Sequence, residues 1–265
     1  MPDYFPHLKH GLGTQFPIRR STKYRTVVNA GDLATNLRAS DPGAKRIAWW
    51  LRYRGLDDDE VGSLQNLFRA VRGPLRPFVF LDPEDNLIAE SEDLSKAVWQ
   101  KSPGLTMGTA GSTPAETQLA YQLSASGGPA EIAQTVAAPA SYRWLLSVFA
   151  RSGSGSAVTL FVRSSSGEES STMALTSQWK RYSFGGQFWT SGEGIDVGLR
   201  LGSGSTAEVA GFQLESQIAP SRYKASGAHN GVYNDARFSQ DSIRVTTVAP
   251  NCHQVNLIIT APLPE

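Results

Sequence analysis

Eight short segments of alternating apolar and polar residues follow one another between residues 117 and 214, with no helical pattern between them. Alternation with a period of two predicts strands with one buried face. Links rich in Gly and Ser separate many of them, and they are short enough to predict hairpin loops rather than flexible linkers. Strands in such a series predict an antiparallel β-sandwich of the jelly-roll type. The segments are 117–123, 131–136, 142–150, 157–163, 171–175, 179–184, 195–201 and 207–214.

The residues before this series have a different composition, with more charged, aromatic and β-branched side chains. Two segments, 22–30 and 45–54, predict strands because β-branched and aromatic residues favour a pleated surface. Gly31-Asp32 and Asp41-Pro42-Gly43 lie between them and predict turns. Residues 78–81, Phe-Val-Phe-Leu, predict a further strand that ends at Asp82-Pro83.

A single helix is predicted between these strands. Asp57 is a favourable N-cap, and Glu60, three positions later, completes a capping box. Apolar residues then recur at helical spacing at Val61, Leu64, Leu67, Phe68 and Val71. Gly73-Pro74 predicts the end of the helix, because Gly permits a left-handed cap and Pro prevents continuation.

The last forty residues return to the composition of the first eighty. Segments 236–248 and 253–260 predict two strands, which are too few to fold alone. They need a sheet to join, and the candidate is the sheet formed by the strands of the first 81 residues. We therefore expect a mainly β protein in which a discontinuous β-domain with one helix, residues 1–85 and 226–265, is interrupted by a β-sandwich, residues 86–225. Residues 82–88 and 222–228 must then lie side by side.

Composition limits the function classes. The 265 residues suit two domains, and the formal net charge of +1 provides no overall field for nucleic acid. The N-terminal residues lack the basic and apolar regions of a secretory signal, and no apolar run reaches the length of a membrane span. A soluble product of the cytoplasm without nucleic-acid binding or membrane insertion is expected. The one cysteine, Cys252, is expected to be a half-buried structural thiol.

No catalytic or metal-binding constellation stands out. His7 and His10 are three residues apart, but Pro6, Gly11 and Gly13 argue against the helix that would bring them together on one face. Gly153-Ser154-Gly155 lacks the following helix of a nucleophile elbow. The acidic residues of the 86–225 segment show no pair with the spacing of a glycosidase. The expectation is a protein without enzymatic activity, metal or cofactor.

Aromatic residues in the same segment offer a different chemistry. A sugar-binding site needs aromatic faces that stack on pyranose rings, together with polar partners for hydroxyl groups. Trp189 lies among glycines and serines, and Tyr142 and Trp144 are placed to share one strand face. These three residues are the candidate carbohydrate-binding residues, although a core role remains open for each.

Two stretches carry resemblances to known families. Residues 45–83 combine an aromatic strand, a helix with Leu56, Glu60, Leu64 and Phe68, a Gly, and a strand ending in Asp-Pro. This order resembles the core of distal tail and minor tail proteins of long-tailed bacteriophages and gene transfer agents. From Asn86, the stretch NLIAESEDLSKAVWQKS is similar to the first segment of carbohydrate-binding-module-like jelly rolls in phage tail proteins. The stretch VAGFQLESQIAPSRYKAS resembles the last strands of such modules.

The resemblance implies a structural protein of the virion tail tip, made in the bacterial cytoplasm. Its discontinuous domain would form a ring, commonly a hexamer, that joins the tail tube to the hub and adhesion apparatus. The inserted domain would project and could contact glycans of the host surface. Tyr4, Phe5 and Trp49 are the candidate interface residues, and Trp50 is a further apolar residue that an interface could use, with a core role equally open for either tryptophan. The alternative is a non-catalytic carbohydrate-binding protein independent of a tail.

Overall fold

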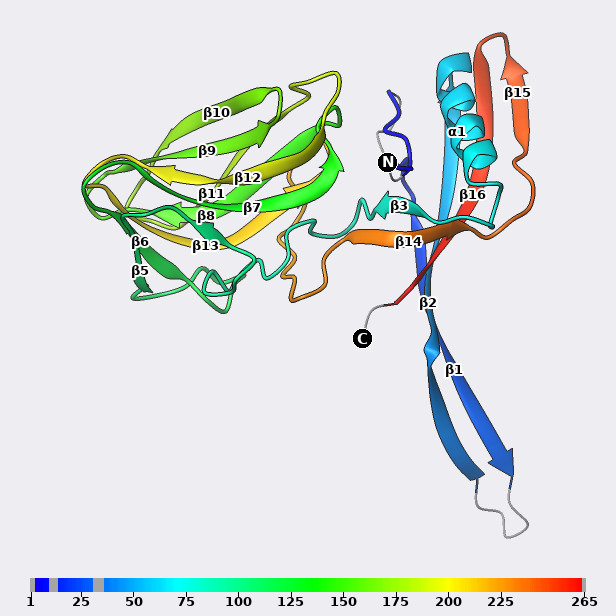
Figure 1. Ribbon diagram of the computed structural model, residues 1–265, viewed down its shortest axis with the longest axis horizontal. Coiled ribbons are helices and arrows are strands. Elements are labelled where there is room, and N and C mark those ends of the chain that lie inside the picture. The colour runs from blue at the N-terminus through cyan, green and yellow to red at the C-terminus, as the bar shows by residue number, and fades with distance from the viewer. Residues whose placement is uncertain (1–2, 10–13, 31–35, 264–265) are drawn as a thin grey trace. The chain divides into compact units, whose positions relative to one another are not determined.

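The computed structural model describes residues 3–9, 14–30 and 36–263. It divides into two compact units, coloured along the chain in Figure 1. Unit 1 comprises Met1–Leu81 and Val232–Glu265, and unit 2 comprises Asp82–Gly231. The chain therefore leaves unit 1 after residue 81 and returns at residue 232. The sequence analysis placed these two boundaries at 85/86 and 225/226, a few residues inside unit 2.

Unit 1 is built on a six-stranded sheet with the order β1-β2-β16-β14-β3, to which β15 is added by pairing with β16. The strands β14 and β16, which follow unit 2 in the chain, complete the sheet begun by the strands that precede it. The bounds are β1 Arg19–Ala30, β2 Asn36–Leu56, β3 Phe78–Leu81, β14 Val232–Phe238, β15 Val245–Ala249 and β16 Cys252–Pro262.

Two local predictions for unit 1 are corrected. Segment 236–248 is not one strand, because the polar residues between Phe238 and Val245 interrupt it and leave β14 and β15 as separate strands. Asp41-Pro42-Gly43 lies inside β2 rather than in a turn. The pairing of β1 with β2 shifts register between Lys23 and Arg25 at this point, and such an irregularity tolerates a proline that has no N–H to donate. Gly31-Asp32 lies outside the described residues.

The helix α1, Asp58–Ala70, begins as predicted. The Glu60 N–H donates to Asp57 Oδ1 at 2.8 Å, and the Asp57 N–H donates to Glu60 Oε2 at 2.9 Å. This reciprocal pair confirms the capping box. Beyond the helix, Gly73 has a φ of +63°, the left-handed conformation that glycine adopts without steric cost.

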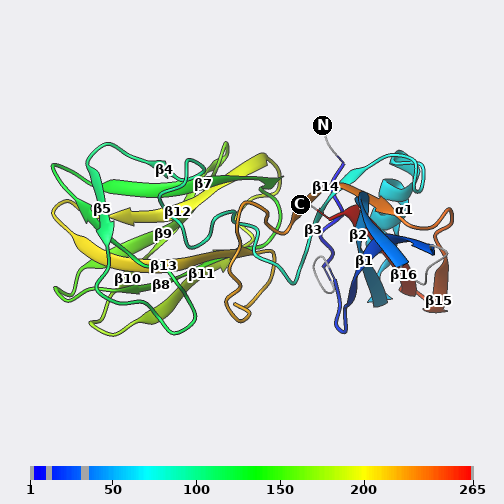
Figure 2. The same cartoon turned by 90° about the horizontal axis from the view of Figure 1, so that it is seen from below.

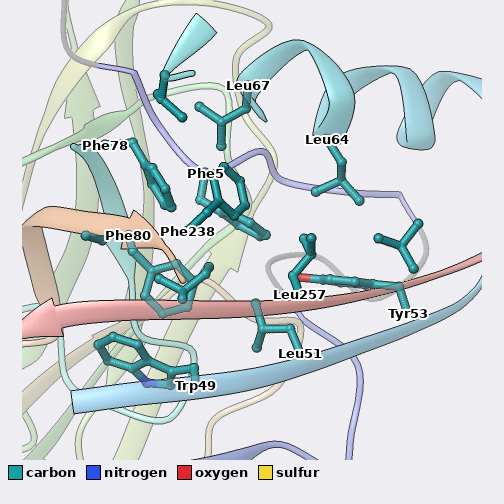
Figure 3. Packing of buried hydrophobic residues seen from close by; sticks show 14 of the residues in the cluster. Phe5, Trp49, Leu51, Tyr53, Leu64, Leu67, Phe78, Phe80, Phe238 and Leu257 are labelled. Atoms are coloured by element: carbon teal, nitrogen blue, oxygen red, sulfur yellow. The ribbon is translucent and has the colours of Figure 1, made fainter. Parts of the chain in front are cut away.

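The core of unit 1 lies between α1 and one face of the sheet. Figure 3 shows Leu64 and Leu67 of α1 above Trp49 and Leu51 of β2. Trp49 is fully buried and its ring packs 4.8 Å from that of Phe80, centroid to centroid. Because successive strand residues point to opposite faces, the side chains at odd positions of β2 face the helix and those at even positions face away from it.

Unit 2 is an antiparallel β-sandwich of two five-stranded sheets, as predicted. Their orders are β10-β9-β12-β7-β4 and β11-β8-β13-β6-β5. Figure 2 shows β7 and β12 in one layer and β8 and β13 in the other. The bounds are β4 Gln100–Lys101, β5 Leu105–Thr109, β6 Tyr121–Ala125, β7 Ala130–Pro139, β8 Trp144–Arg151, β9 Ala157–Ser164, β10 Gly167–Ala174, β11 Lys180–Gly186, β12 Glu193–Leu201 and β13 Thr206–Glu215.

The links rich in Gly and Ser differ from the prediction in one respect. They are short loops, but those between β6 and β7, β8 and β9, and β12 and β13 join strands of opposite sheets and are not hairpins. Only the β5–β6 and β9–β10 connections among the described residues of unit 2 are hairpins within one sheet. Most loops of the sandwich therefore gather at its two ends as crossovers between layers.

The first and last segments of unit 2 are joined by hydrogen bonds. The Asp82 N–H donates to the Gly231 carbonyl at 2.8 Å, and the Glu90 N–H donates to the Gly227 carbonyl at 2.7 Å. The buried Asn86 side chain donates from Nδ2 to the Lys224 carbonyl at 3.1 Å. Residues 82–88 and 222–228 thus lie side by side, as an inserted domain requires.

Candidate functional site

Two crossovers of unit 2 lie next to each other at one end of the sandwich. One joins β7 to β8 and the other joins β11 to β12, and these strands are paired within their sheets, β7 with β12 and β8 with β11. The Ala140 N–H donates to the Gly192 carbonyl at 2.9 Å, and Gln187 Nε2 donates to the Ser141 carbonyl at 3.0 Å. The two loops therefore support each other.

Aromatic rings gather on the β11–β12 crossover. Phe188 stacks on Phe184 at 5.2 Å between centroids, with 16° between the planes, and meets Trp189 edge to face at 5.5 Å. Gly186 makes this arrangement possible, because a Cβ there would lie 2.7 Å from Phe188 Cε1. Phe184, Phe188 and Trp189 are all partly exposed. Ring surface therefore remains accessible on the end of the sandwich.

Tyr142 belongs to the neighbouring crossover and is partly exposed, whereas Trp144 is fully buried. Their rings stack 6.0 Å apart with 23° between the planes. Trp144 alternates along β8 with Ser147 and Arg151 on the opposite face, so its indole points into the sandwich with Leu146. The structure thus keeps Tyr142 and Trp189 as candidate sugar contacts and places Trp144 beneath Tyr142 as support, with no ring face left for a ligand.

Small polar side chains surround the rings. A Cβ at Gly192 would lie 3.7 Å from the Ser166 hydroxyl and 3.8 Å from that of Ser165. A Cβ at Gly167 would lie 3.9 Å from the Trp189 indole nitrogen. The turn between β9 and β10 therefore joins the two crossovers. We define the aromatic end as Tyr142, Phe184, Phe188 and Trp189. Its rings and neighbouring hydroxyl and amide groups have the chemistry that binds sugars by stacking and hydrogen bonding. The sequence analysis did not choose Phe184 or Phe188 as candidates, although the spacing of Phe184, Phe188 and Trp189 around glycines is visible in the sequence.

Two carboxylates of unit 2 come together on the outer face of the sheet that contains β9. Glu131 and Glu168 are both bound by Arg163 and Arg200, at N···O distances between 2.8 and 3.2 Å. Both guanidinium groups lie over the Phe161 ring, 4.7 and 5.1 Å from its centroid. The four charges form a closed network around an aromatic ring.

This network determines the protonation of its acids. Partial burial alone would raise the pKa of Glu131, but the hydrogen bonds from Arg163 and Arg200 outweigh it and lower that pKa. The Arg200 hydrogen bonds likewise lower the pKa of Glu168. Both carboxylates are therefore ionised at neutral pH, and neither can serve as the general acid of a glycosidase there.

The candidate interface residues lie in unit 1, and two of the three are in its core. Trp49 is fully buried, and Phe5 is 4% exposed and packs edge to face on Phe80 at 5.5 Å. Tyr4 is partly exposed and forms a parallel bridge with Val79, which extends the sheet beyond β3. The side chains of Trp49 and Phe5 therefore cannot reach a second chain. Trp50, which the sequence analysis also considered for an interface, is half-buried and lies on the open face of the sheet.

Neither a metal site nor a membrane span is found in the part of the chain that the structure describes. No group of three or more His, Cys, Asp or Glu side chains there could hold a metal ion. No described helix is long and apolar enough to cross a membrane. Cys252 is a free, half-buried thiol.

Comparisons with known proteins give similarity at the level of solved structures. No family model and no curated protein matches the chain. The chain is similar to the enzymatically active domain of bacteriophage CBA120 tailspike protein 4, with 13% identity and a TM-score of 0.42 over 51% of this chain and 22% of that one. It is similar to TmCBM61, solved with beta-1,4-galactotriose, with 17% identity and a TM-score of 0.40 over 50% of this chain and 99% of that one. The CBM22-1 xylan-binding domain from Paenibacillus barcinonensis Xyn10C matches with 12% identity and a TM-score of 0.39 over 51% of this chain and 97% of that one.

Proposed function

We propose that the chain is a structural component of a phage-type tail tip. In this proposal, unit 1 assembles into a hexameric ring between tail tube and hub, and unit 2 is a guest domain that binds glycans of the host surface through the aromatic end. The chain has no enzymatic activity of its own in this proposal, and its place is the virion.

The observation that carries the ring is a two-stranded ribbon. Among the described residues, 25–30 of β1 pair only with 36–41 of β2, and β16 reaches no further along β2 than Arg46. Val27 and Val28 point to opposite faces, yet they are 40% and 49% exposed, so the part of the chain that the structure describes covers neither face there. An isolated ribbon of two strands is marginal in water. Contacts with further chains would cover it, as the ring requires.

The aromatic end supports glycan binding by unit 2. Tyr142, Phe188 and Trp189 present partly exposed rings on loops that are hydrogen bonded to each other, so the rings are held in place before any ligand arrives. Preorganised rings lose little conformational freedom on binding, which favours affinity. The nearby Ser and Gln side chains offer donors and acceptors for sugar hydroxyls.

Two measurements test the proposal. Mass photometry of the purified chain should show a ring-sized oligomer, and negative-stain micrographs should show rings. A species that stays monomeric up to high concentration would contradict the assembly. A glycan array should show binding that is lost in Trp189→Ala, with Leu119→Ala as the control for an exposed apolar residue elsewhere in unit 2.

The second candidate function is a non-catalytic carbohydrate-binding protein that works without a tail. The aromatic end favours it as much as it favours the first. The oligomeric state distinguishes the two candidate functions. Specific glycan binding by a monomer would favour the second, and a ring with weak or no glycan binding would favour the first. Turnover of a polysaccharide by the purified chain would contradict both.

A further inference from the structure

The face of the unit 1 sheet that points away from α1 is open and cationic. On β2 it carries Trp50, Arg52 and Arg54, and their partners on β16 are Ile258, Asn256 and Gln254. Trp50 also pairs with Arg19 of β1. Arg19, Arg52 and Arg54 are exposed, and Trp50 and Ile258 are half-buried between them. We call this surface the Trp50 face.

Two hollows flank the tryptophan. One of about 340 Å³ lies toward β16, and one of about 360 Å³ lies toward Pro17 and Ile18. Trp50 and Arg52 line both. Tryptophan and arginine beside pockets are the residues that contribute most binding energy in protein interfaces. The Trp50 face therefore has the features of a docking surface and not only of a solvated sheet.

The positive charge of this face is not neutralised within the described chain. No described carboxylate lies within ion-pair distance of Arg19, Lys23, Arg46, Arg52 or Arg54. The net charge of +1 for the whole chain does not show the positive charge of unit 1. Unit 1 has 15 basic and 10 acidic residues, a net charge of +5, whereas unit 2 has 10 basic and 14 acidic residues, a net charge of −4.

The charge disfavours one mode of self-association. Two copies that met Trp50 face to Trp50 face about a twofold axis would oppose like charges, which is unfavourable. A complementary surface exists on the other side of the same unit, since α1 covers the opposite face of the sheet and begins with Asp58 and Asp59. Their side chains are 75% and 86% exposed. The contacts that they make, Asp58 with His253 and Asp59 with Lys9, leave these carboxylates accessible.

We infer that the Trp50 face receives the acidic first turn of α1 from a second copy of the chain. Opposite charges on opposite sides of one unit produce a head-to-tail contact, which closes into a ring when the rotation per copy is a whole fraction of a turn. The inference rests on the proposed self-assembly and names its surfaces. Arg52 and its neighbours on the Trp50 face pair with the carboxylates of Asp58 and Asp59.

Charge reversal on the full chain tests the pairing. Arg52→Glu and Asp59→Lys should each raise the concentration for half-assembly at least tenfold, measured by mass photometry and sedimentation at low salt. An equimolar mixture of the two variants should assemble again, because each reversed face then meets a reversed helix start. Copies must alternate in such a ring, so only even-numbered species should form. Arg222→Glu, an exposed reversal in unit 2, should assemble like the unchanged chain.

Each result separates this inference from the function proposed above. A chain that is monomeric without any substitution overturns both. An oligomer that survives Arg52→Glu and Arg54→Glu, or a mixture that fails to reassemble although circular dichroism shows both variants folded, overturns the pairing and leaves the ring proposal standing. Arg52-dependent binding of a labelled single-stranded oligonucleotide, with assembly unchanged in Arg52→Glu, would assign the face to a polyanion and overturn it as well.

Discussion

Asp82 donates its backbone N–H to the carbonyl of Gly231 at 2.8 Å. One residue further out, Leu81 is paired with Val232 as the last pair between β3 and β14. The chain thus passes into unit 2 and out of it through neighbouring positions, which is the arrangement that tolerates insertion of one domain into another. Within unit 1, strand pairs join its two sequence segments directly, β14 with β3 and β16 with β2.

Replacement of residues 82–231 by a short Gly-Ser linker should leave unit 1 folded. The pairs of β14 with β3 and β16 and the helix-covered core all lie outside the excised segment. The far-ultraviolet circular dichroism should keep its helical contribution, and heating should give one cooperative transition. A chain without a cooperative transition would show that unit 1 depends on its guest. Residues 82–231 expressed alone are the matching control for unit 2.

Trp144 and Trp189 should respond differently to truncation. Trp144→Ala removes a fully buried ring and should lower the free energy of unfolding by about 3–5 kcal/mol. Trp189→Ala removes a partly exposed ring and should cost well under half of that, while glycan binding is lost. Urea unfolding compares the stabilities, and the glycan array compares the binding. Equal destabilisation by both substitutions would identify Trp189 as a core residue.

The network around Phe161 should make stability depend on pH. The pKa values of Glu131 and Glu168 are lowered from 4.5 in the folded chain. The stabilisation is therefore fully present above pH 4.5 and is lost as the pH falls through the lower folded values. Because the groups are partly exposed, Glu131→Gln should cost about 1 kcal/mol at pH 7 and less at pH 3, measured by urea unfolding. Glu193→Gln, an exposed substitution away from the network, is the control variant.

Gly198 should not tolerate alanine. A Cβ there would lie 2.1 Å from the Ile132 carbonyl oxygen and 2.9 Å from Phe161 Cζ, so backbone or ring must move. Overpacking of this kind costs about 1–3 kcal/mol, and the displaced ring would also disturb Arg163 and Arg200. Gly108→Ala, with no atom within 4 Å of the new Cβ, is the control in a strand of the other sheet. Thermal unfolding that is equal for the two variants would contradict the packing.

Local signals made much of the fold predictable. The Asp57–Glu60 capping box and the strand at Phe78–Leu81 depend on a few adjacent residues, and both are found where the sequence placed them. The two-residue strand β4 and the strand β5 lack a clear apolar alternation and were missed. The sheet to which each strand belongs depends on contacts distant in sequence, so the crossovers rich in Gly and Ser were taken for hairpins.

The side chains of candidate sites were harder to place than the elements. Trp49 and Trp50 are adjacent and equally apolar, so composition does not decide which of them is buried. The alternation along β2 does decide it. Arg52 and Arg54 lie on the same face as Trp50 and are exposed, whereas Leu51 and Tyr53 lie on the other face with Trp49 and are buried. The same argument assigns Trp144 to the interior, since Ser147 and Arg151 have the other parity. The aromatic end, by contrast, depends on how two crossovers meet, and no local pattern contains that information.

The paired connections at Leu81 and Val232 also have a mechanical consequence. If unit 2 is held by an external surface, a pulling force enters unit 1 through two strands at once and at the same end of both. The pulling force then acts on β3 and β14 in the same direction. It passes to the aromatic core of unit 1 through Phe78, Phe80 and Phe238. A domain attached at a chain terminus would instead load a single strand, which could peel from the sheet one hydrogen bond at a time.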